Sequence, residues 1–406
     1  MTLLRVFVPF ACGFFLSYLY RVVNAVIAPD LIGELHLDAA DLGFLTSAYF
    51  LTFAVFQLPL GILLDRFGPR RTESALLMFA AAGAFVFATA GGTVGLVAGR
   101  ALIGLGVSAC LMAAFKAFTL FFSRDRLPLV YGCQMAVGGL GALAGTAPVE
   151  AALGITDWRG VFLALGLMTV LVGAALFLVV PEKDPGHERG ASIGELARGI
   201  AEIYLSPVFW RIAPLTVAAQ AAFLSMQSLW VGPWLKDIAG LGRAAVAGHL
   251  LAVAAAMIAG FFLLGAAAER LSRLGIRPIA VAVCCMTAFM AVQAAIVFGW
   301  TGAALLLWVL FGFFGTAGIL PYSVLSQSFP SHLAGRVITG LNFLVFVAAF
   351  LGQWGIGAVI NLWPSAAEGA YAAAGYQAAF GMMLALEAAA FAWFALVTLR
   401  ARYAST

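Results

Sequence analysis

The stretch Gly61-Ile-Leu-Leu-Asp65-Arg66-Phe-Gly68-Pro-Arg70-Arg71 decides the fold of this chain. It packs one carboxylate, three arginines and two glycines into a short link between two long apolar runs. A weaker copy, Gly265-Ala-Ala-Ala-Glu269-Arg270-Leu-Ser-Arg273-Leu-Gly275-Ile-Arg277-Pro278, lies in the second half of the chain. Two such links, at matching places in two hydrophobic halves, indicate an internally duplicated membrane protein.

The composition excludes an ordinary soluble protein. Of the 406 residues, 64% are hydrophobic and only 10% are charged, whereas about a quarter of the residues of a soluble domain are charged. Long apolar runs recur, each near the ~20 residues that cross a ~30 Å hydrocarbon core as a helix. The composition therefore predicts an all-α polytopic protein that lies in a lipid bilayer.

Twelve membrane spans can be placed along the chain. Their predicted limits are 5–28, 42–63, 73–91, 94–119, 129–152, 160–180, 208–233, 245–267, 278–298, 302–327, 337–361 and 376–399. The longest polar stretch, residues 181–207, separates a first bundle of six helices (1–180) from a second (208–406). Within this link, Ile193–Tyr204 is predicted to be an amphipathic helix that lies along the membrane surface.

The distribution of lysine and arginine predicts the orientation. With the amino terminus inside, most of the 22 Lys and Arg residues fall in inner segments, and only Arg159, Lys236 and Arg243 fall in outer ones. By the positive-inside rule, both termini are expected in the cytoplasm, which places the protein in the inner membrane. The net charge of +4 follows from this anchoring and gives no indication of nucleic-acid binding.

Together these features resemble the major facilitator superfamily of secondary transporters. The first link is similar to its signature G-x-x-x-D-R-x-G-x-R-R, and Arg100, Gly104 and Gly106 match a second signature, R-x-x-x-G-x-G. The resemblance implies two pseudo-symmetric bundles of six helices and alternating access by rocking of one bundle against the other. It also implies a small-molecule substrate, no enzymatic activity and a monomer.

The first span is similar to that of the organic-anion and anion:cation symporter branches. The pattern is Tyr18-Leu-Tyr20-Arg21-Val-Val-Asn24, in which the arginine of the branch faces an anionic substrate. Tyr20 stands where the branch usually has an aspartate. The resemblance implies transport of a small organic anion, driven by a proton that enters with it.

Three cations fall inside predicted spans, where each needs a partner, a cavity or a route to the interface. Arg21 suits recognition of a carboxylate, because its planar fork can bond two oxygens at once, but it could also form a structural pair with an acid. Arg100 is predicted either near the proton or substrate path or bonded to carbonyl groups of a neighbouring helix. Lys116 either extends to the inner interface or supplies a second charge to an anion.

Two acids are expected well inside the spans. Glu150 lies near the outer end of the fifth span and Glu387 lies in the twelfth. A buried carboxylate can carry a proton, as symport requires, and Glu150 could also pair with Arg21 or Arg100. Further polar side chains are predicted to contact the substrate, because polar groups that face lipid are unfavourable. They are Tyr18, Asn24, Tyr49 and Gln134 in the first half, and Gln227, Trp230, Tyr322 and Asn342 in the second.

The two charged links are predicted to work as gates. Asp65 is expected to approach Arg336 and the amino terminus of the eleventh helix, and Glu269 is expected to act in the same way near Arg126. Asp65→Asn is therefore predicted to shift the protein towards its inward-open state. The other residues assigned to the gates are Gly61, Arg66, Gly68, Arg70, Arg71 and Arg270.

Other functions find little support in the sequence. The five cysteines are scattered through apolar segments and have no zinc-site spacing, and no phosphate loop or nucleophile elbow occurs at an exposed turn, so neither metal nor cofactor is expected. One alternative is an exporter of drugs or of carboxylate-rich siderophores. The other is a transporter-like sensor that binds a ligand and signals to a partner.

Overall fold

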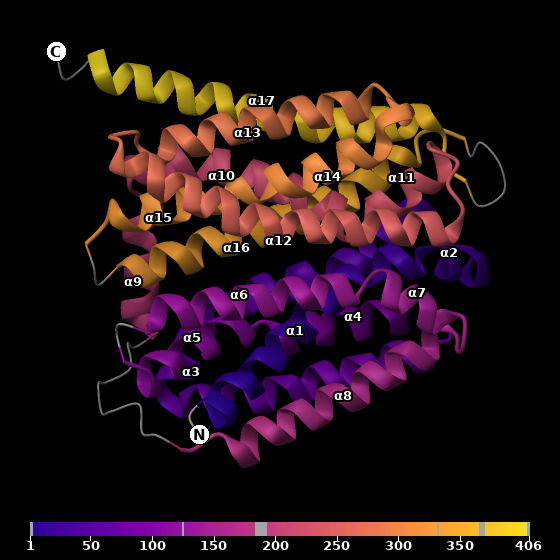
Figure 1. Ribbon diagram of the computed structural model, residues 1–406, viewed down its shortest axis with the longest axis horizontal. Helices are drawn as coiled ribbons and strands as arrows, with labels where there is room; N and C mark the ends of the chain where they lie inside the picture. Colours follow the sequence, from indigo (N-terminus) through magenta and orange to yellow (C-terminus); the bar gives the residue numbers. More distant parts are fainter. Residues whose placement is uncertain (1–2, 124–125, 183–192, 331–332, 365–369, 404–406) are drawn as a thin grey trace. The chain divides into compact units, whose positions relative to one another are not determined.

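The computed structural model describes residues 3–123, 126–182, 193–330, 333–364 and 370–403 (Figure 1). Within them, eleven helices are long and apolar enough to cross a membrane. One of these, α3 (Ala39–Thr89), has 51 residues but is interrupted at Gly68, where φ is 75° and ψ is 164°. Counting its two parts separately gives twelve spans, and the predicted all-α membrane fold is confirmed.

The chain divides into two compact units. Unit 1 comprises Met1–Leu37 and Phe44–Ile193, and unit 2 comprises Asp38–Gly43 and Gly194–Thr406. Much of the link predicted at 181–207, residues 183–192, lies outside the described residues. The helix predicted at Ile193–Tyr204 is present as α9 and belongs to unit 2, apart from its first residue.

Unit 1 contains the part of α3 from Phe44 onward, together with the helices that come before and after it in the first half of the chain. They are η1 (Leu3–Phe7), α1 (Val8–Val22), α2 (Asn24–Leu35), α4 (Thr93–Val107), α5 (Cys110–Phe121), α6 (Leu127–Ala144), α7 (Ala147–Leu153) and α8 (Trp158–Val179). Unit 2 continues with α10 (Pro207–Ser225), η2 (Met226–Trp230), α11 (Val231–Asp237), α12 (Arg243–Arg273), α13 (Pro278–Val297), η3 (Thr301–Ala303), α14 (Ala304–Gly315), η4 (Thr316–Ile319), α15 (Leu320–Gln327), α16 (Ala334–Ile360) and α17 (Ala373–Tyr403).

Several spans are interrupted helices. The hydrogen-bond pattern of the first span is interrupted at Val23, between α1 and α2, although the backbone there keeps helical dihedral angles (φ −54°, ψ −32°). The fifth span breaks at Gly145 and Thr146, between α6 and α7, where Thr146 leaves the helical region. The seventh contains the π-helical turn η2, and the tenth contains the 3-10 turn η4. Such irregular turns inside helices are frequent at functional sites and hinges, so they are candidate positions for a binding site.

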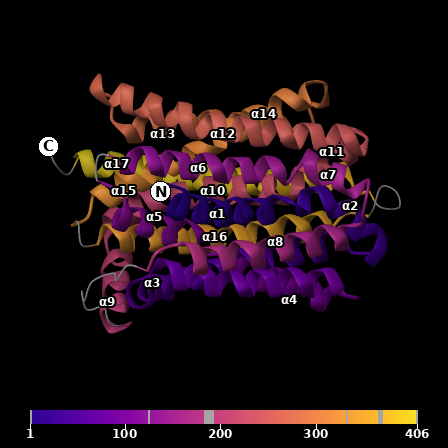
Figure 2. The same cartoon turned by 60° about the horizontal axis from the view of Figure 1, so that its bottom comes forward.

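Helix α1 is the centre of unit 1, where it packs against α4, α5, α6 and α8 (Figures 1 and 2). Its contact with α6 is close because α6 presents glycines. A Cβ atom at Gly141 would overlap the backbone of Phe15, and one at Gly145 would overlap Val22. These small residues thus allow the close approach of α1 and α6.

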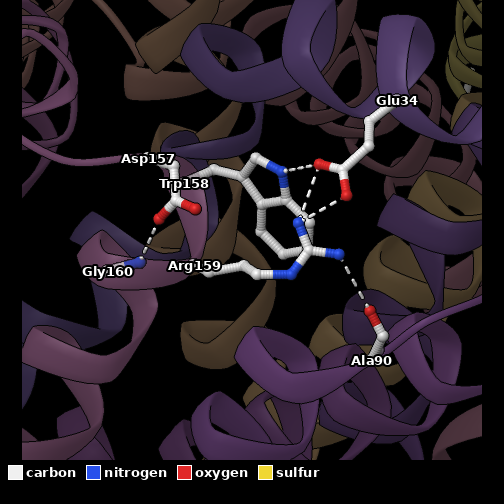
Figure 3. Close-up of polar contacts among 6 residues, drawn as sticks. All are labelled: Glu34, Ala90, Asp157, Trp158, Arg159 and Gly160. Carbon is white, nitrogen blue, oxygen red and sulfur yellow. Dashed lines mark hydrogen bonds and ion pairs between the residues drawn. The ribbon is translucent and has the colours of Figure 1, made fainter.

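A polar clamp joins three segments at one end of unit 1 (Figure 3). Glu34, near the end of α2, accepts hydrogen bonds from Trp158 Nε1 at 2.8 Å and from Arg159 Nη1 at 2.7 Å. The Arg159 guanidinium lies 4.1 Å from the Trp158 ring centroid and donates to the Ala90 carbonyl at 3.2 Å. Asp157 caps the start of α8 by accepting a hydrogen bond from Gly160 N. The clamp thus ties α2, the end of α3 and the start of α8 together.

This clamp predicts a pH-dependent stability. The hydrogen bonds from Arg159 and Trp158 lower the pKa of Glu34. A carboxyl whose pKa is lower in the folded state stabilises that state above its unfolded pKa of about 4.3, and this contribution disappears as the pH falls through the folded pKa. We expect Glu34→Gln to lower the thermal unfolding midpoint at pH 7, and the difference from wild type to shrink in acid.

Thermal unfolding in detergent at a series of pH values measures the effect. The control is Glu269→Gln, which removes one partner of an exposed ion pair with Arg273 and should change the midpoint little. A difference between wild type and Glu34→Gln that stays constant from neutral to acid pH would contradict the assignment.

Candidate functional site

The interruption of the first span brings two predicted substrate residues to one buried place in unit 1. Arg21 lies in the last turn of α1 with 7% of its surface exposed, and Asn24 begins α2 with 0% exposed. The Arg21 guanidinium lies over the Tyr18 ring, 4.5 Å from its centroid, and 5.6 Å from the centroid of Phe53. Tyr49 also neighbours this guanidinium. The site therefore combines a cation with aromatic walls.

Asn24 is the second notable group of this site. Both atoms of its side-chain amide are buried, and neither has a hydrogen-bond partner among the described residues. A buried amide without partners costs roughly 1–3 kcal/mol on the scale of protein mutations. The Asn24 amide is therefore suited to donate a hydrogen bond to a bound anion.

Arg100 bonds to a neighbouring helix. Its Nη1 donates to the Tyr20 carbonyl at 2.8 Å, and its guanidinium lies 5.1 Å from the Tyr49 ring centroid. Tyr20 in turn shares a hydrogen bond of 2.9 Å with Thr169 on α8, and the Tyr49 hydroxyl donates to the Ser17 carbonyl at 3.3 Å. Of the two roles predicted for Arg100, the structure shows the hydrogen bond to a carbonyl group. This bond holds the end of α1 next to Arg21.

Lys116 is placed away from this group. Its ammonium forms an ion pair with Asp65 of the first link, so its charge is matched there. We therefore leave Lys116 out of the candidate anion site. Gln134, another predicted substrate contact, donates from Nε2 to the Phe10 carbonyl at 3.3 Å, and its side-chain oxygen has no hydrogen-bond partner among the described residues.

The first link makes its contacts within unit 1. Gly68 adopts a positive φ that favours glycine, and the chain turns there. Arg70 donates from Nε to the Phe177 carbonyl at 2.8 Å, and both Arg70 and Arg71 form ion pairs with Glu182. These contacts fasten the link to the end of α8.

The remaining gate residues lie near the surface of their units. Arg66 lies 5.4 Å from the Phe67 ring centroid, and Glu269 accepts a hydrogen bond from Arg273, four residues further along α12, at 2.6 Å. A Cβ atom at Gly199 of α9 would overlap the Arg336 side chain, so Arg336 packs on that helix. Arg126 and Arg270 are exposed, and Gly61 would leave open space around a Cβ atom. The approaches of Asp65 to Arg336 and of Glu269 to Arg126 stay predictions.

The two predicted proton carriers have different surroundings. Glu150 is half-buried on the short helix α7. Glu387 on α17 is 2% exposed and accepts a hydrogen bond from Gln293 of α13 at 2.6 Å. This bond joins two helices of unit 2, and the other carboxylate oxygen of Glu387 has no hydrogen-bond partner among the described residues, so its role as a proton carrier stays a prediction.

The sequence analysis missed a third buried acid, Glu73. It has 0% of its surface exposed, and neither carboxylate oxygen has a hydrogen-bond partner among the described residues. The predicted third span starts at residue 73, and a charged residue at the end of a span attracts no attention in a sequence. A signal was present: Glu73 shares its helical register with Leu77, Ala80, Ala84 and Phe87, all of which are buried.

The predicted substrate residues of unit 2 form two groups, each of which has one hydrogen bond to α16. In the first, Trp230 of η2 donates to the Gln353 carbonyl at 3.1 Å, and Gln227 lies 3.9 Å from the Met257 sulfur. In the second, the Tyr322 hydroxyl donates to Asn342 Oδ1 at 2.8 Å. Their contact with a substrate stays a prediction.

The structure thus combines helices of membrane-spanning length, in two compact units, with a buried cation in the first unit. Residues 10–353 match the family model of the Major Facilitator Superfamily, and the chain belongs to that superfamily.

Several curated relatives are similar over part of their length. The chain is 34% identical over 175 residues to the transporter YybO of Bacillus subtilis, a match that covers 43% of this chain and 40% of YybO. It is 27% identical to the probable sulfoacetate transporter SauU of Cupriavidus necator, over 42% of this chain and 40% of SauU. It is 26% identical to the hexuronate transporter of Escherichia coli K12, over 58% of each chain. The match thus spans less than two thirds of each relative.

Solved structures share the fold over nearly the whole chain. A bacterial homologue of the human lysosomal transporter Spinster superposes with a TM-score of 0.78 at 18% identity, covering 97% of this chain and 96% of that one. A D-xylose-proton symporter superposes with a TM-score of 0.71 at 14% identity, covering 95% and 97%. At these identities the likeness concerns the fold alone.

Proposed function

We propose that this transporter carries a small organic anion across the inner membrane by alternating access, together with a proton. The observation that carries the proposal is the buried pair of Arg21 and Asn24 at the interruption of the first span. A guanidinium can form two parallel, charge-assisted hydrogen bonds to a carboxylate or sulfonate, and the Asn24 amide can donate one more. The phenol ring of Tyr18 covers one face of the guanidinium.

The relatives support this class of substrate. The printed names of two of them refer to hexuronate and to sulfoacetate, small molecules that each carry an acidic group. Proton symport is the driving reaction implied by the resemblance of the first span to anion:cation symporters. Glu150, half-buried in unit 1, is the proton carrier predicted from the sequence.

The test is uptake into proteoliposomes under an imposed pH gradient, with D-glucuronate and sulfoacetate as probes. Because a hydrogen bond to a charged group is worth about 1.5–3 kcal/mol, Arg21→Ala should reduce kcat/KM roughly 10- to 150-fold. Arg21→Lys should restore only part of the uptake, because an ammonium cannot reproduce the planar fork.

A matched control removes an arginine from an exposed place. Arg273→Ala takes away a side chain that is 78% exposed and should leave uptake close to that of wild type. Wild-type uptake in Arg21→Ala would exclude the proposed anion contact. Accumulation that occurs only when the gradient is reversed would favour the exporter.

A further inference from the structure

The buried carboxyl of Glu73 has no cation that matches it among the described residues. It lies on the part of α3 that follows Gly68, and neither of its oxygens has a hydrogen-bond partner there. The two arginines that precede it, Arg70 and Arg71, form ion pairs with Glu182 instead. Glu73 thus differs from Glu387, whose carboxylate accepts a hydrogen bond from an amide.

Three helices surround this carboxyl. Helix α1 contributes Gly13, where a Cβ atom would overlap Glu73 Oε1, so the carboxyl lies directly against the backbone of α1. Helix α5 contributes Cys110, the titratable group that faces Glu73. On the neighbouring side, Gly173 of α8 packs against Met78 and the Ser74 carbonyl and brings no titratable group. The carboxyl is thus fully buried and close-packed against α1.

This packing discriminates between the two protonation states. An ionised carboxylate that is buried without a partner is very unfavourable, whereas a neutral carboxylic acid is tolerated. The observed contact of α1 with Glu73 therefore fits the neutral acid. The ionised form needs water or a cation at its oxygens, and either can reach them only if α1, α3 and α5 separate. Protonation of Glu73 and the packing of α1 are thus linked.

The same helix carries the candidate anion contact. Gly13 and Arg21 are both on α1, and a separation of eight residues corresponds to a rise of about 12 Å. A movement of α1 at Glu73 will displace Arg21 and, beyond it, Asn24.

We propose that Glu73 is the proton-binding residue of the transport cycle. When α1 separates from α3, the carboxylate takes up one proton from water, and α1 then closes on the neutral acid. Release of that proton to water regenerates the carboxylate and separates the helices again. This inference rests on the anion–proton symport proposed above, and assigns the coupling proton to Glu73 in place of Glu150.

The transport experiment compares two reactions of Glu73→Gln in proteoliposomes. The amide keeps the shape of the neutral acid but cannot release a proton. Counterflow exchange of labelled D-glucuronate, which needs no pH gradient, should remain measurable, whereas accumulation driven by the gradient should be lost. Glu202→Gln, which changes an exposed acid of α9, should still accumulate the anion. Gradient-driven accumulation by Glu73→Gln, or its loss in Glu150→Gln alone, would overturn the assignment.

A second measurement does not depend on the substrate. Infrared spectra of the purified protein in lipid should contain a carbonyl band of a protonated carboxyl that disappears reversibly as the pH rises and is missing from Glu73→Gln. A band that is present equally in wild type and Glu73→Gln, or one that never titrates, would exclude Glu73. If wild-type protein transports neither D-glucuronate nor sulfoacetate, the proposed substrate class fails, and this titration alone decides whether Glu73 exchanges a proton.

Discussion

Replacement of Gly106 by leucine is expected to remove nearly all folded protein. Gly106 lies on α4, and a Cβ atom there would overlap the backbone nitrogen and the Cβ atom of Ala80 on α3. Both obstacles belong to a helix backbone that cannot rotate away, unlike the end of a long side chain. Overpacking of a core typically costs about 1–3 kcal/mol, and the rigid neighbour places this substitution at or above that range.

Size-exclusion chromatography of a fluorescent fusion in mild detergent measures the result, since unfolded protein elutes as aggregate. The matched control is Gly132→Leu on α6, where a Cβ atom would meet nothing within 4 Å. Both substitutions improve helix propensity to the same extent. A sharp peak of folded Gly106→Leu, equal to that of the control, would show that α4 and α3 can separate without loss of the fold.

The second large effect is expected for Arg100→Met. This change keeps a long side chain but removes the donor to the Tyr20 carbonyl, which lies among the last carbonyl groups of α1. Such groups have no partner within their own helix, and the membrane interior offers no water to replace one. We expect a loss of about 1–3 kcal/mol in stability, and a large loss of uptake because Arg21 follows Tyr20 directly.

Arg100→Lys separates the two roles predicted for this arginine. An ammonium can still donate to the Tyr20 carbonyl, so a structural role predicts that lysine restores part of both the unfolding midpoint and the uptake. If Arg100→Met keeps the wild-type midpoint and loses only uptake, Arg100 acts in the proton or substrate path instead. Thermal unfolding and proteoliposome uptake, measured on the same preparations, distinguish these results.

The sequence was sufficient to predict the helical membrane fold, because the features that indicate it are local and occur many times along the chain. Apolar runs of spanning length and two charged links do not depend on which helices meet. The interruptions inside the spans were not predicted. The π-helical turn at Met226–Trp230 contains no proline or glycine that would signal it, and its Trp230 donates a hydrogen bond to the Gln353 carbonyl of α16.

The site was only partly predictable, because partners depend on the tertiary contacts. Arg21 and Arg100 were identified correctly as cations within the spans, since burial of a charge is visible in one segment. The pairing of Lys116 with Asp65 joins residues 51 positions apart, and that of Gln293 with Glu387 joins residues 94 positions apart. Glu73 was missed because a span boundary was placed at the residue itself, where a charge is unremarkable.

Helix α8 has a mechanical consequence, because it is fastened at both ends. Arg159 joins one end to Glu34 and Ala90, and the Phe177 carbonyl joins the other to Arg70. A helix that is held at both ends bends little, so we expect unit 1 to deform mainly at its interrupted helices. The breaks of the first and fifth spans adjoin each other, since Gly145 packs on Val22. We therefore expect unit 1 to change its shape most easily next to Arg21, so that a bound anion at Arg21 would act directly on both interrupted spans.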